Sequence, residues 1–548
     1  MSDDTPLPFD LPSVCHKKLT VDFNGGNQSS NGGVLLLREA ERSVGVCRLL
    51  ANTMTDRRDP NRIRHEVFEM LMARVSAIAC GYEDANDLDR LRHDPLMKLA
   101  VGRCPEGGEA LASQSTISRL ENAPRKTEAA RLCAALIDLF GTTVKPGKLE
   151  ILDIDDTFCA AHGGQQLAFW NAHHNERGFA PMHIYHVASG TPVVAILRAA
   201  RTPKGTEVRT VIKHVTKRLR KHWPNTRIVW RGDGHYGRVE EMERAESDGT
   251  DYIFGLAGNP VLDVLMAETA DNLCFHHAGS NQTKLRTYAS FFYQASSWDR
   301  ARKVVARLEC SLQPDGEEGT ATGMRQEVDI RYVVTSLEGT AQHLYEDVYC
   351  QRGQMENLIK LHKAQLSSDR MSCHSATANQ VRLVLHTAAF WLMHGVRAAI
   401  PQTNPLANAE FATIRERLIK LGARVIEHIA RIRIHLPSSC PERALFRTVA
   451  LLSCRAAHEQ RGHGAPYARP FGPINPKRVA RRVTLHRSAG RSSPSSAQHT
   501  CENPSRYALL RLSAWLAMKH PDYPQLTPNT IANNLRAEHR AFQQNARK

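Results

Sequence analysis

Long apolar runs are missing from this sequence of 548 residues. The longest candidate, residues 381–400, is interrupted by two arginines and two histidines. Since a transmembrane helix needs about 20 predominantly apolar residues, we expect no membrane span. The first ten residues, MSDDTPLPFD, are acidic and lack the basic and then apolar pattern of a signal peptide. These absences predict a cytoplasmic protein with no membrane partner.

Closely spaced cysteine pairs are missing as well. The 13 cysteines are scattered singly from Cys15 to Cys501, and none forms a C-x-x-C pair. This distribution argues against a disulfide framework and against a zinc ribbon, and it favours reduced thiols.

Acidic residues are too few to balance the basic ones. The chain has 72 Lys and Arg against 56 Asp and Glu, a formal net charge of +16, while its 42% hydrophobic and 23% charged residues are ordinary for a globular protein. Such an excess of positive charge indicates a polyanionic partner, with nucleic acid ahead of a membrane surface.

Residues 1–145 are expected to be mostly helical and to bind DNA. A short hairpin is possible around the Gly-Gly pairs of residues 1–45, and helical spacing of apolar residues begins near residue 61. The stretch LASQSTISRLENAP fits the second helix of a helix-turn-helix, in which Ser115, Thr116, Ser118 and Arg119 would contact the major groove. A small helical bundle whose serines cap helices explains the same pattern equally well.

The remaining chain predicts an α/β arrangement with an insertion. Residues 146–258 contain strands in series followed by alternating helices and strands, residues 259–345 are β-rich, and residues 346–455 return to helices, two or three of them long within 374–455. Residues 456–548 carry 15 Lys and Arg against 4 Asp and Glu, so their net charge is 15 − 4 = +11. This last part is expected to be a partly disordered basic tail with one short amphipathic helix.

Carboxylates follow two strands of the α/β part. The stretch LDIDDT places Asp153, Asp155 and Asp156 at the end of one strand, with Asp153 and Asp155 on one face and Asp156 on the other. The stretch WRGDGHYG places Asp233 just after a later strand. Open α/β sheets bind ligands at such ends, although a single aspartate there is more often a turn or capping residue.

A third carboxylate lies in the helical stretch YCQRGQMENLIKLHK. Tyr349, Arg352, Glu356 and Lys363 fall on one face of a 3.6-period helix, opposite Met355, Leu358, Ile359, Leu361 and Leu366. The simple alternative is a solvated face with an Arg352–Glu356 pair. Together with Asp155 and Asp233, however, Glu356 completes an all-oxygen ligand set for two Mg²⁺ ions about 4 Å apart, with Mn²⁺ able to substitute, and the basic residues would hold the flanking phosphates.

The order of these elements, with Tyr-x2-Arg-x3-Glu-x6-Lys at the end, resembles the DDE transposases of bacterial insertion sequences. The spacing matches the insertion-sequence-four-like group, and the stretches GYEDANDLDRLRHDP, LASQSTISRLEN, LDIDDT…HGGQ and RGDGHYG resemble the insertion-sequence 1380 family within transposase DDE group 1. The resemblance covers about residues 15–450.

The resemblance implies a ribonuclease H-like catalytic core interrupted by the β-rich insertion. It implies that Asp155, Asp233 and Glu356 are the catalytic, metal-binding triad, with Asp155 preferred to Asp153 because the family's aspartate is followed by x-Thr. Tyr349, Arg352 and Lys363 would grip DNA beside the cut. The expected partners are double-stranded DNA, as terminal inverted repeats and target, and a second copy of the chain in the DNA-bound complex.

Two other functions fit the same residues: a metal-dependent endonuclease without strand transfer, and a non-catalytic or domesticated DNA-binding protein. His162 is expected to be structural or to face substrate rather than to bind metal. Trp298 is a core tryptophan or, less favoured, a platform on which a displaced base stacks.

Overall fold

The structure is a computed structural model that describes residues 12–315 and 323–462. All of them belong to the first of two units into which the chain divides, Met1–Gly472 and Pro473–Lys548. The basic tail and its amphipathic helix, predicted beyond residue 456, lie outside the described residues except for 456–462, which continue helix α14 (Arg443–Gly462).

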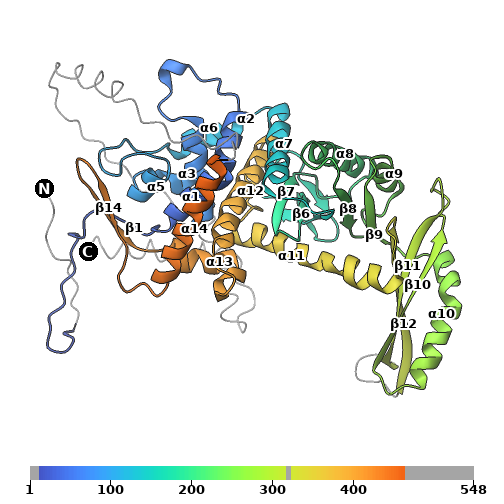
Figure 1. Ribbon diagram of the computed structural model, residues 1–548. Helices are drawn as coiled ribbons and strands as arrows, with labels where there is room; N and C mark the ends of the chain where they lie inside the picture. Colours follow the sequence, from blue (N-terminus) through green and yellow to red (C-terminus); the bar gives the residue numbers. More distant parts are fainter. Residues whose placement is uncertain (1–11, 316–322, 463–548) are drawn as a thin grey trace, which may run out of the picture. The chain divides into compact units, whose positions relative to one another are not determined.

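A mixed sheet forms the centre of the α/β part (Figure 1). Within the described ranges it has eight strands in the order β10-β11-β12-β9-β8-β2-β6-β7. Strands β2, β8 and β9 are mutually parallel, and every other neighbouring pair is antiparallel. The bounds are β2 (Leu149–Asp156), β6 (Met182–His186), β7 (Thr191–Ile196), β8 (Arg227–Gly232), β9 (Asp251–Leu256), β10 (Lys284–Tyr293), β11 (Arg302–Asp315) and β12 (Gly323–Thr335).

Alternating side chains explain why these strands are central. Leu152 and Ile154 of β2 and Trp230 of β8 are fully buried on the face that α8 (Gly205–His222) and α9 (Val239–Ser247) cover. Val229 of β8 and Ile253 of β9 lie in a second cluster on the opposite face. Helices on both faces are the arrangement that parallel strands require, and the strands and helices predicted for residues 146–258 are confirmed.

The β-rich insertion extends this same sheet rather than forming a separate one. Strand β12 pairs with β9, and the long strands β11 and β10 follow at the edge. The predicted strands are confirmed, but helix α10 (Pro260–Ala278), which packs on β10 and β11, was not predicted. Its signal is present in the sequence: Asn259 caps its first turn and proline occupies its first position.

Helices from both ends of the chain share one hydrophobic core. Helix α12 (Ala376–Ala398) is buried along most of its length and contacts α1, α2, α3, α6 and α7, while α14 packs on α1. Among the described helices none is long and apolar enough to cross a membrane. The amino-terminal helices are α1 (Val34–Val44), α2 (Val46–Thr53), α3 (Val67–Ala79), α4 (Leu88–Leu91), α5 (Pro95–Ala100), α6 (Gln114–Asn122) and α7 (Lys126–Thr143).

Two expectations about the ends of this helical part are wrong. No hairpin forms around the Gly-Gly pairs: Val14 and Lys17 make an isolated antiparallel bridge, and β1 (Gln28–Ser29) pairs with β13 (Ala423–Glu427). Residues 423–435 are not helical, because β13 and β14 (Ile432–His435) form an antiparallel pair, and α13 (Phe411–Ile414) is a single turn continued by the π-helical η7 (Arg415–Ile419). The alternation in ARVIE and IRIH favours strands, but β1 lies nearly four hundred residues earlier in the chain.

A small further sheet contains β3 (Cys159–Ala160), β5 (Glu176–Phe179) and β4 (Phe169–Asn171).

A continuous helical segment, residues 343–365, links the insertion to the helical part (Figure 1). One end contacts β11, its middle contacts β6 and its other end packs on α12 and α13. Only its centre is a regular α-helix. The segment consists of η3 (His343–Tyr349, π-helical), η4 (Cys350–Arg352, 3-10), α11 (Gly353–Lys360) and η5 (Leu361–Gln365, π-helical).

Candidate active site

The carboxyl ends of β2 and β8 bring Asp155 and Asp233 together. The strands are parallel and adjacent, with Ile154 beside Gly232, so the residues that follow meet at one edge of the sheet. Asp155 is largely buried, with 14% of its side chain exposed, while the Asp233 side chain is 29% exposed. Asp233 Oδ1 accepts a hydrogen bond from the backbone N–H of His235 at 2.9 Å, which fixes the turn after β8.

Asp153 lies on the same face as Asp155, but its carboxylate is paired with a buried arginine. The guanidinium of Arg231, directly opposite on β8, donates to Asp153 Oδ2 at 2.7 Å, and both side chains are inaccessible to solvent. Arg231 also donates to the backbone carbonyl of Val348 in η3. This ion pair therefore fastens the helical segment to the sheet.

Asp156 points to the other face, as the alternation predicted. Its Oδ2 lies 3.2 Å from a guanidinium nitrogen of Arg198. Arg198 in turn pairs with Glu207 of α8 at 3.0 Å. Asp156 is thus held by the α8 face of the sheet, whereas Asp155 faces the helical segment.

Arg352 links the helical segment to Asp155. Its guanidinium donates to Asp155 Oδ2 at 2.8 Å and lies 3.6 Å from Glu356 Oε1. Glu356 is 66% exposed, and its ion-pair partner among the described residues is Arg352. The Arg352–Glu356 pair expected as the simple alternative is therefore present, while Arg352 also reaches the sheet.

The other two residues predicted on this helix face, Tyr349 and Lys363, lie on either side of α11. Tyr349 is half-buried, and its hydroxyl lies close to Gly255 at the end of β9. Lys363 donates from Nζ to the carbonyl oxygen of Phe158, just past β2, at 2.5 Å. The apolar side of the segment is buried as predicted: Met355, Leu358, Ile359, Leu361 and Leu366.

Burial and neighbouring carboxylates both disfavour the charged form of Asp155. Burial raises the pKa of Asp155 to about 7, the charge of Arg352 opposes this increase, and the neighbouring charges of Asp233 and Asp156 add to it. Burial also raises the pKa of Asp156 and of Asp153. Several carboxylates at one sheet edge therefore repel each other where water is scarce.

A groove of about 670 Å³ opens beside Asp233. It runs between the ends of β8 and β9, the insertion strands and η3, and Arg307 and Arg331 stand opposite each other on β11 and β12. Arginines from the insertion were not among the predicted site residues, although their alternation in ARLEC and DIRYV marks one strand face. Its charged and aromatic lining is Arg286, Arg307, Arg331, Arg352, His235, Glu346, Tyr332, Tyr345 and Tyr349.

The sequence matches the family described as transposase DDE domain group 1 over residues 11–455. The chain belongs to this family. No match is found among curated proteins. Among solved structures, the cryo-EM structure of a piggyBac transposase synaptic complex with hairpin DNA is similar at a TM-score of 0.35 and 10% sequence identity, covering 84% of this chain and 87% of that chain.

DDE transposases generally use divalent metal ions, and this transposase offers part of a fitting site. Asp155 and Asp233 supply hard oxygen donors at adjacent strand ends, with the mutual repulsion that a cation relieves. Among the described residues, however, no three His, Cys, Asp or Glu side chains are grouped to hold a metal ion. The guanidinium of Arg352 lies between Asp155 and Glu356 instead.

The predicted DNA-contacting residues of the transposase's amino-terminal part lie on α6, which packs within the helical core. Ser115 and Arg119 are exposed and Thr116 is half-buried. Thr116 Oγ1 hydrogen-bonds to Ser113 Oγ at 3.1 Å and accepts from Arg119 at 3.2 Å. Helix α6 contacts α3 and α12, as in the bundle alternative, and Ser113 stands at its amino-terminal cap position, but the Ser113 side chain makes no capping hydrogen bond.

Trp298 and His162 are the two remaining candidates from the sequence. Trp298 is only 7% exposed and packs edge-on against Tyr293, with the Arg302 guanidinium 5.6 Å from its ring, so the core alternative is confirmed. His162 is exposed, and its backbone carbonyl accepts a hydrogen bond from Gln165.

Proposed function

We propose that this transposase binds the terminal inverted repeats of a bacterial insertion sequence and catalyses DNA cleavage and strand transfer at Asp155, Asp233 and Glu356. The observation that carries the proposal is the meeting of Asp155 and Asp233 at adjacent parallel strand ends, with the Arg352 guanidinium 2.8 Å from Asp155. The family match over residues 11–455 supports the same chemistry.

The strand order supports a ribonuclease H-like core. Its first strand, β2, lies between an antiparallel hairpin, β6 and β7, and two parallel strands, β8 and β9. The first and fourth strands of this unit carry Asp155 and Asp233, and the insertion enters after the fifth.

The protein's own residues would prepare the reaction by binding the metal ions and the DNA phosphates. Asp155 and Asp233 would hold Mg²⁺ or Mn²⁺, with Glu356 as the third ligand. The bound metal supplies Lewis-acid stabilisation of the charge that develops on the phosphate. A DNA phosphate competes with Asp155 for Arg352, so DNA binding frees the Asp155 oxygen as the guanidinium moves to the phosphate. Tyr349 and Lys363 hold the neighbouring phosphates.

The chemistry needs no covalent protein–DNA intermediate. Water attacks the phosphodiester at the end of the element, the bond from phosphorus to the 3′ oxygen breaks, and a 3′-hydroxyl is released. This hydroxyl attacks a second phosphodiester, of the opposite strand or of target DNA, and displaces its 3′ oxygen. We propose a homodimer as the assembly that pairs the two ends of the element.

The test is an assay of the purified protein on duplexes that carry the ends flanking its own gene. Incubation with Mg²⁺ or Mn²⁺ and a target plasmid should yield both cleaved ends and joined product, while a duplex of scrambled sequence should yield neither. Cleaved ends without joined product would assign a nuclease, and binding without cleavage would contradict catalysis.

A second candidate function is DNA binding without catalysis. The observation that favours it is the Arg352 guanidinium, which pairs with Asp155 and lies near an exposed Glu356. Under this alternative the arrangement is permanent, and terminal DNA would bind with the same affinity whether or not Mg²⁺ is present.

A further inference from the structure

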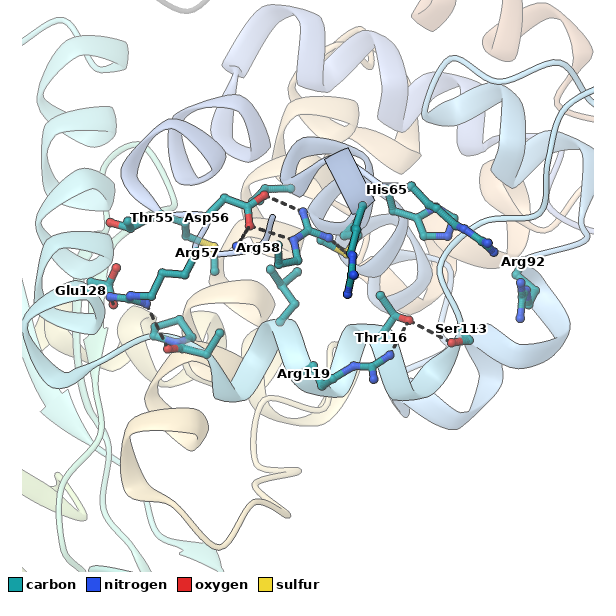
Figure 2. Close-up of a pocket in the computed structure, with 18 residues that line it drawn as sticks. Thr55, Asp56, Arg57, Arg58, His65, Arg92, Ser113, Thr116, Arg119 and Glu128 are labelled. Carbon is teal, nitrogen blue, oxygen red and sulfur yellow. Dashed lines mark hydrogen bonds and ion pairs between the residues drawn. The ribbon is translucent and has the colours of Figure 1, made fainter. Parts of the chain in front are cut away.

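A second cavity lies in the helical part. It has a volume of about 540 Å³ and is enclosed by the loop after α2, the start of α3, α6 and the first turn of α7 (Figure 2). Its charged lining contains six arginines against two acids: Arg57, Arg58, Arg62, Arg64, Arg92 and Arg119, with Asp56 and Glu128.

The two acids are already neutralised within the wall. Arg57 lies 2.6 Å from Glu128, and Arg58 lies 2.7 Å from Asp56 (Figure 2). Among the described residues, Arg64, Arg92 and Arg119 form no ion pair with a carboxylate. The cavity therefore has a net positive charge with nothing in its wall to balance it.

Arg92 gives an independent sign of a missing partner. Its Nε is buried and has no hydrogen-bond partner among the described residues. The wall thus offers this buried N–H no acceptor, and Arg92 lines the cavity with a charge that no carboxylate there neutralises.

The floor of the cavity is apolar. Met70 and Leu120 are 2% and 8% exposed, and Pro124 is buried. Met54 and Val67 are half-buried beside them. The ligand must therefore combine an apolar body with an anionic group.

We infer that this cavity binds a single nucleotide unit, with the base against the apolar floor and the phosphate on Arg92, Arg119 and Arg64. Its volume lies in the range of small-molecule sites, about 300–1,000 Å³. A duplex keeps its bases stacked inside and its phosphates on a convex surface, so it cannot enter a concave site of this size. An unpaired nucleotide of a DNA strand fits, as does a free mononucleotide.

This inference rests on the proposed function only in that DNA is the natural source of the nucleotide. Without divalent cations cleavage does not occur, so binding can be measured independently of catalysis. The probes are a blunt random-sequence duplex, the same duplex extended by a short unpaired tail, and adenosine monophosphate as a competitor.

Arg92→Met and Arg119→Met remove the charge but keep much of the side-chain stem. Each should weaken binding of the tailed duplex by about tenfold relative to the blunt one, since a charge-assisted hydrogen bond to the phosphate is lost. Ala123→Trp should have the same effect by filling the cavity from an exposed position. Arg90→Ala, an exposed arginine on α4 outside the cavity, is the control for lost charge.

Competition distinguishes the two sources of the nucleotide. If adenosine monophosphate displaces the tail and the variants lose this effect, the site accepts free nucleotides as well as DNA. If the variants lose only the preference for the tailed duplex, the site takes a nucleotide within a strand. If all the cavity variants behave like Arg90→Ala on every probe, the inference is overturned, even where the same preparations cleave DNA with Mg²⁺.

Discussion

At the scale of single residues, neighbouring aspartates of one strand have opposite roles. Asp153 is paired with Arg231 in the interior, and that arginine also anchors Val348. Asp155, two residues later, is buried with less compensation, and its pKa is raised to about 7. The same residue type is therefore in a fully buried ion pair at one position and, at the next position on that face, paired with the partly exposed Arg352.

This difference predicts opposite effects of one substitution. Asp153→Asn leaves Arg231 buried without its counter-ion and should lower the free energy of unfolding by about 3–5 kcal/mol. Asp155→Asn removes a charge that burial disfavours, so stability should be unchanged or higher. Urea unfolding of the two variants measures both effects, and an equal loss in the two would contradict these roles.

Substitution of Arg352 should change the affinity for DNA rather than the stability of the fold. Arg352→Ala removes the guanidinium that we propose moves from Asp155 to a phosphate, so terminal DNA should bind more weakly and cleavage should require more DNA. The dependence of cleavage on Mg²⁺ concentration should stay as it was. Fluorescence anisotropy with labelled terminal duplex measures the affinity, with Arg90→Ala as the control for lost charge. Unchanged affinity would make Arg352 only a partner of Asp155 and Glu356.

At the scale of elements, local signals explain which strands and helices the sequence predicts and which it does not. Strands β2, β8 and β9 are predictable because each contains closely spaced apolar residues and is followed by polar or glycine-rich residues. Helix α10 has apolar residues all round without a clear face, so periodicity does not predict it, and only its Asn259-Pro260 start marks it in the sequence. Strands β13 and β14 belong to a sheet that β1 completes, and β1 lies too far away in the sequence for a local pattern to reveal the pairing.

The helical segment of residues 343–365 shows the limit of a periodicity argument. A step of 100° per residue holds for Gly353–Lys360, but the segment before it is π-helical and then tightens to a 3-10 turn at Cys350–Arg352, and the turn after it is π-helical. Tyr349 and Lys363 therefore do not lie on one straight helix face with Arg352 and Glu356, as their spacing predicted. The sequence indicated which residue types belong together, but not that Arg352 would lie between Asp155 and Glu356.

The residue that caps α10 should contribute to the stability of the fold. Asn259 Oδ1 accepts from the backbone N–H groups of Val261 and Leu262, each at 3.1 Å. Asn259→Ala should lower the free energy of unfolding by about 1 kcal/mol, whereas Asn259→Asp should preserve the cap. Thermal unfolding of the two variants checks this, and equal stability of Asn259→Ala and the parent would show that the cap contributes nothing.

At the scale of the whole molecule, the site is assembled from parts far apart in the chain. Helices from residues before 145 and after 375 share one core with α12 at its centre, and the segment that carries Arg352 packs on that core at one end. Helix α12 carries two histidines at this core, of which His386 is buried and His394 is half-buried. Burial lowers the pKa of His386 to about 3 and that of His394 to about 4.

These two histidines predict a loss of stability in acid. Their ordinary pKa is about 6.5, so below that pH the unfolded chain takes up protons that the folded chain does not. Each histidine should contribute a loss of up to about 1.4 kcal/mol per pH unit between pH 6.5 and its folded pKa. Denaturant unfolding from pH 7 to pH 4 measures the slope.

The matched variant is His394→Gln, which can still donate to the Ser189 carbonyl, 2.9 Å from the histidine ring. It should flatten the pH dependence, whereas His214→Gln at an exposed position of α8 should not. The same slope in both variants would show that His394 is not a source of the acid lability.

The central claim is that Asp155, Asp233 and Glu356 together perform the cleavage. The most direct measurement is cleavage of terminal duplex in Mg²⁺ by Asp155→Asn, Asp233→Asn and Glu356→Gln, with Glu268→Gln, an exposed glutamate of α10, as the control. We predict that each of the three variants folds, binds terminal DNA and loses cleavage, while Glu268→Gln cleaves at the parental rate. Cleavage at the parental rate by Glu356→Gln would contradict the assignment of the third carboxylate, and parental cleavage by Asp155→Asn or Asp233→Asn would contradict the account as a whole.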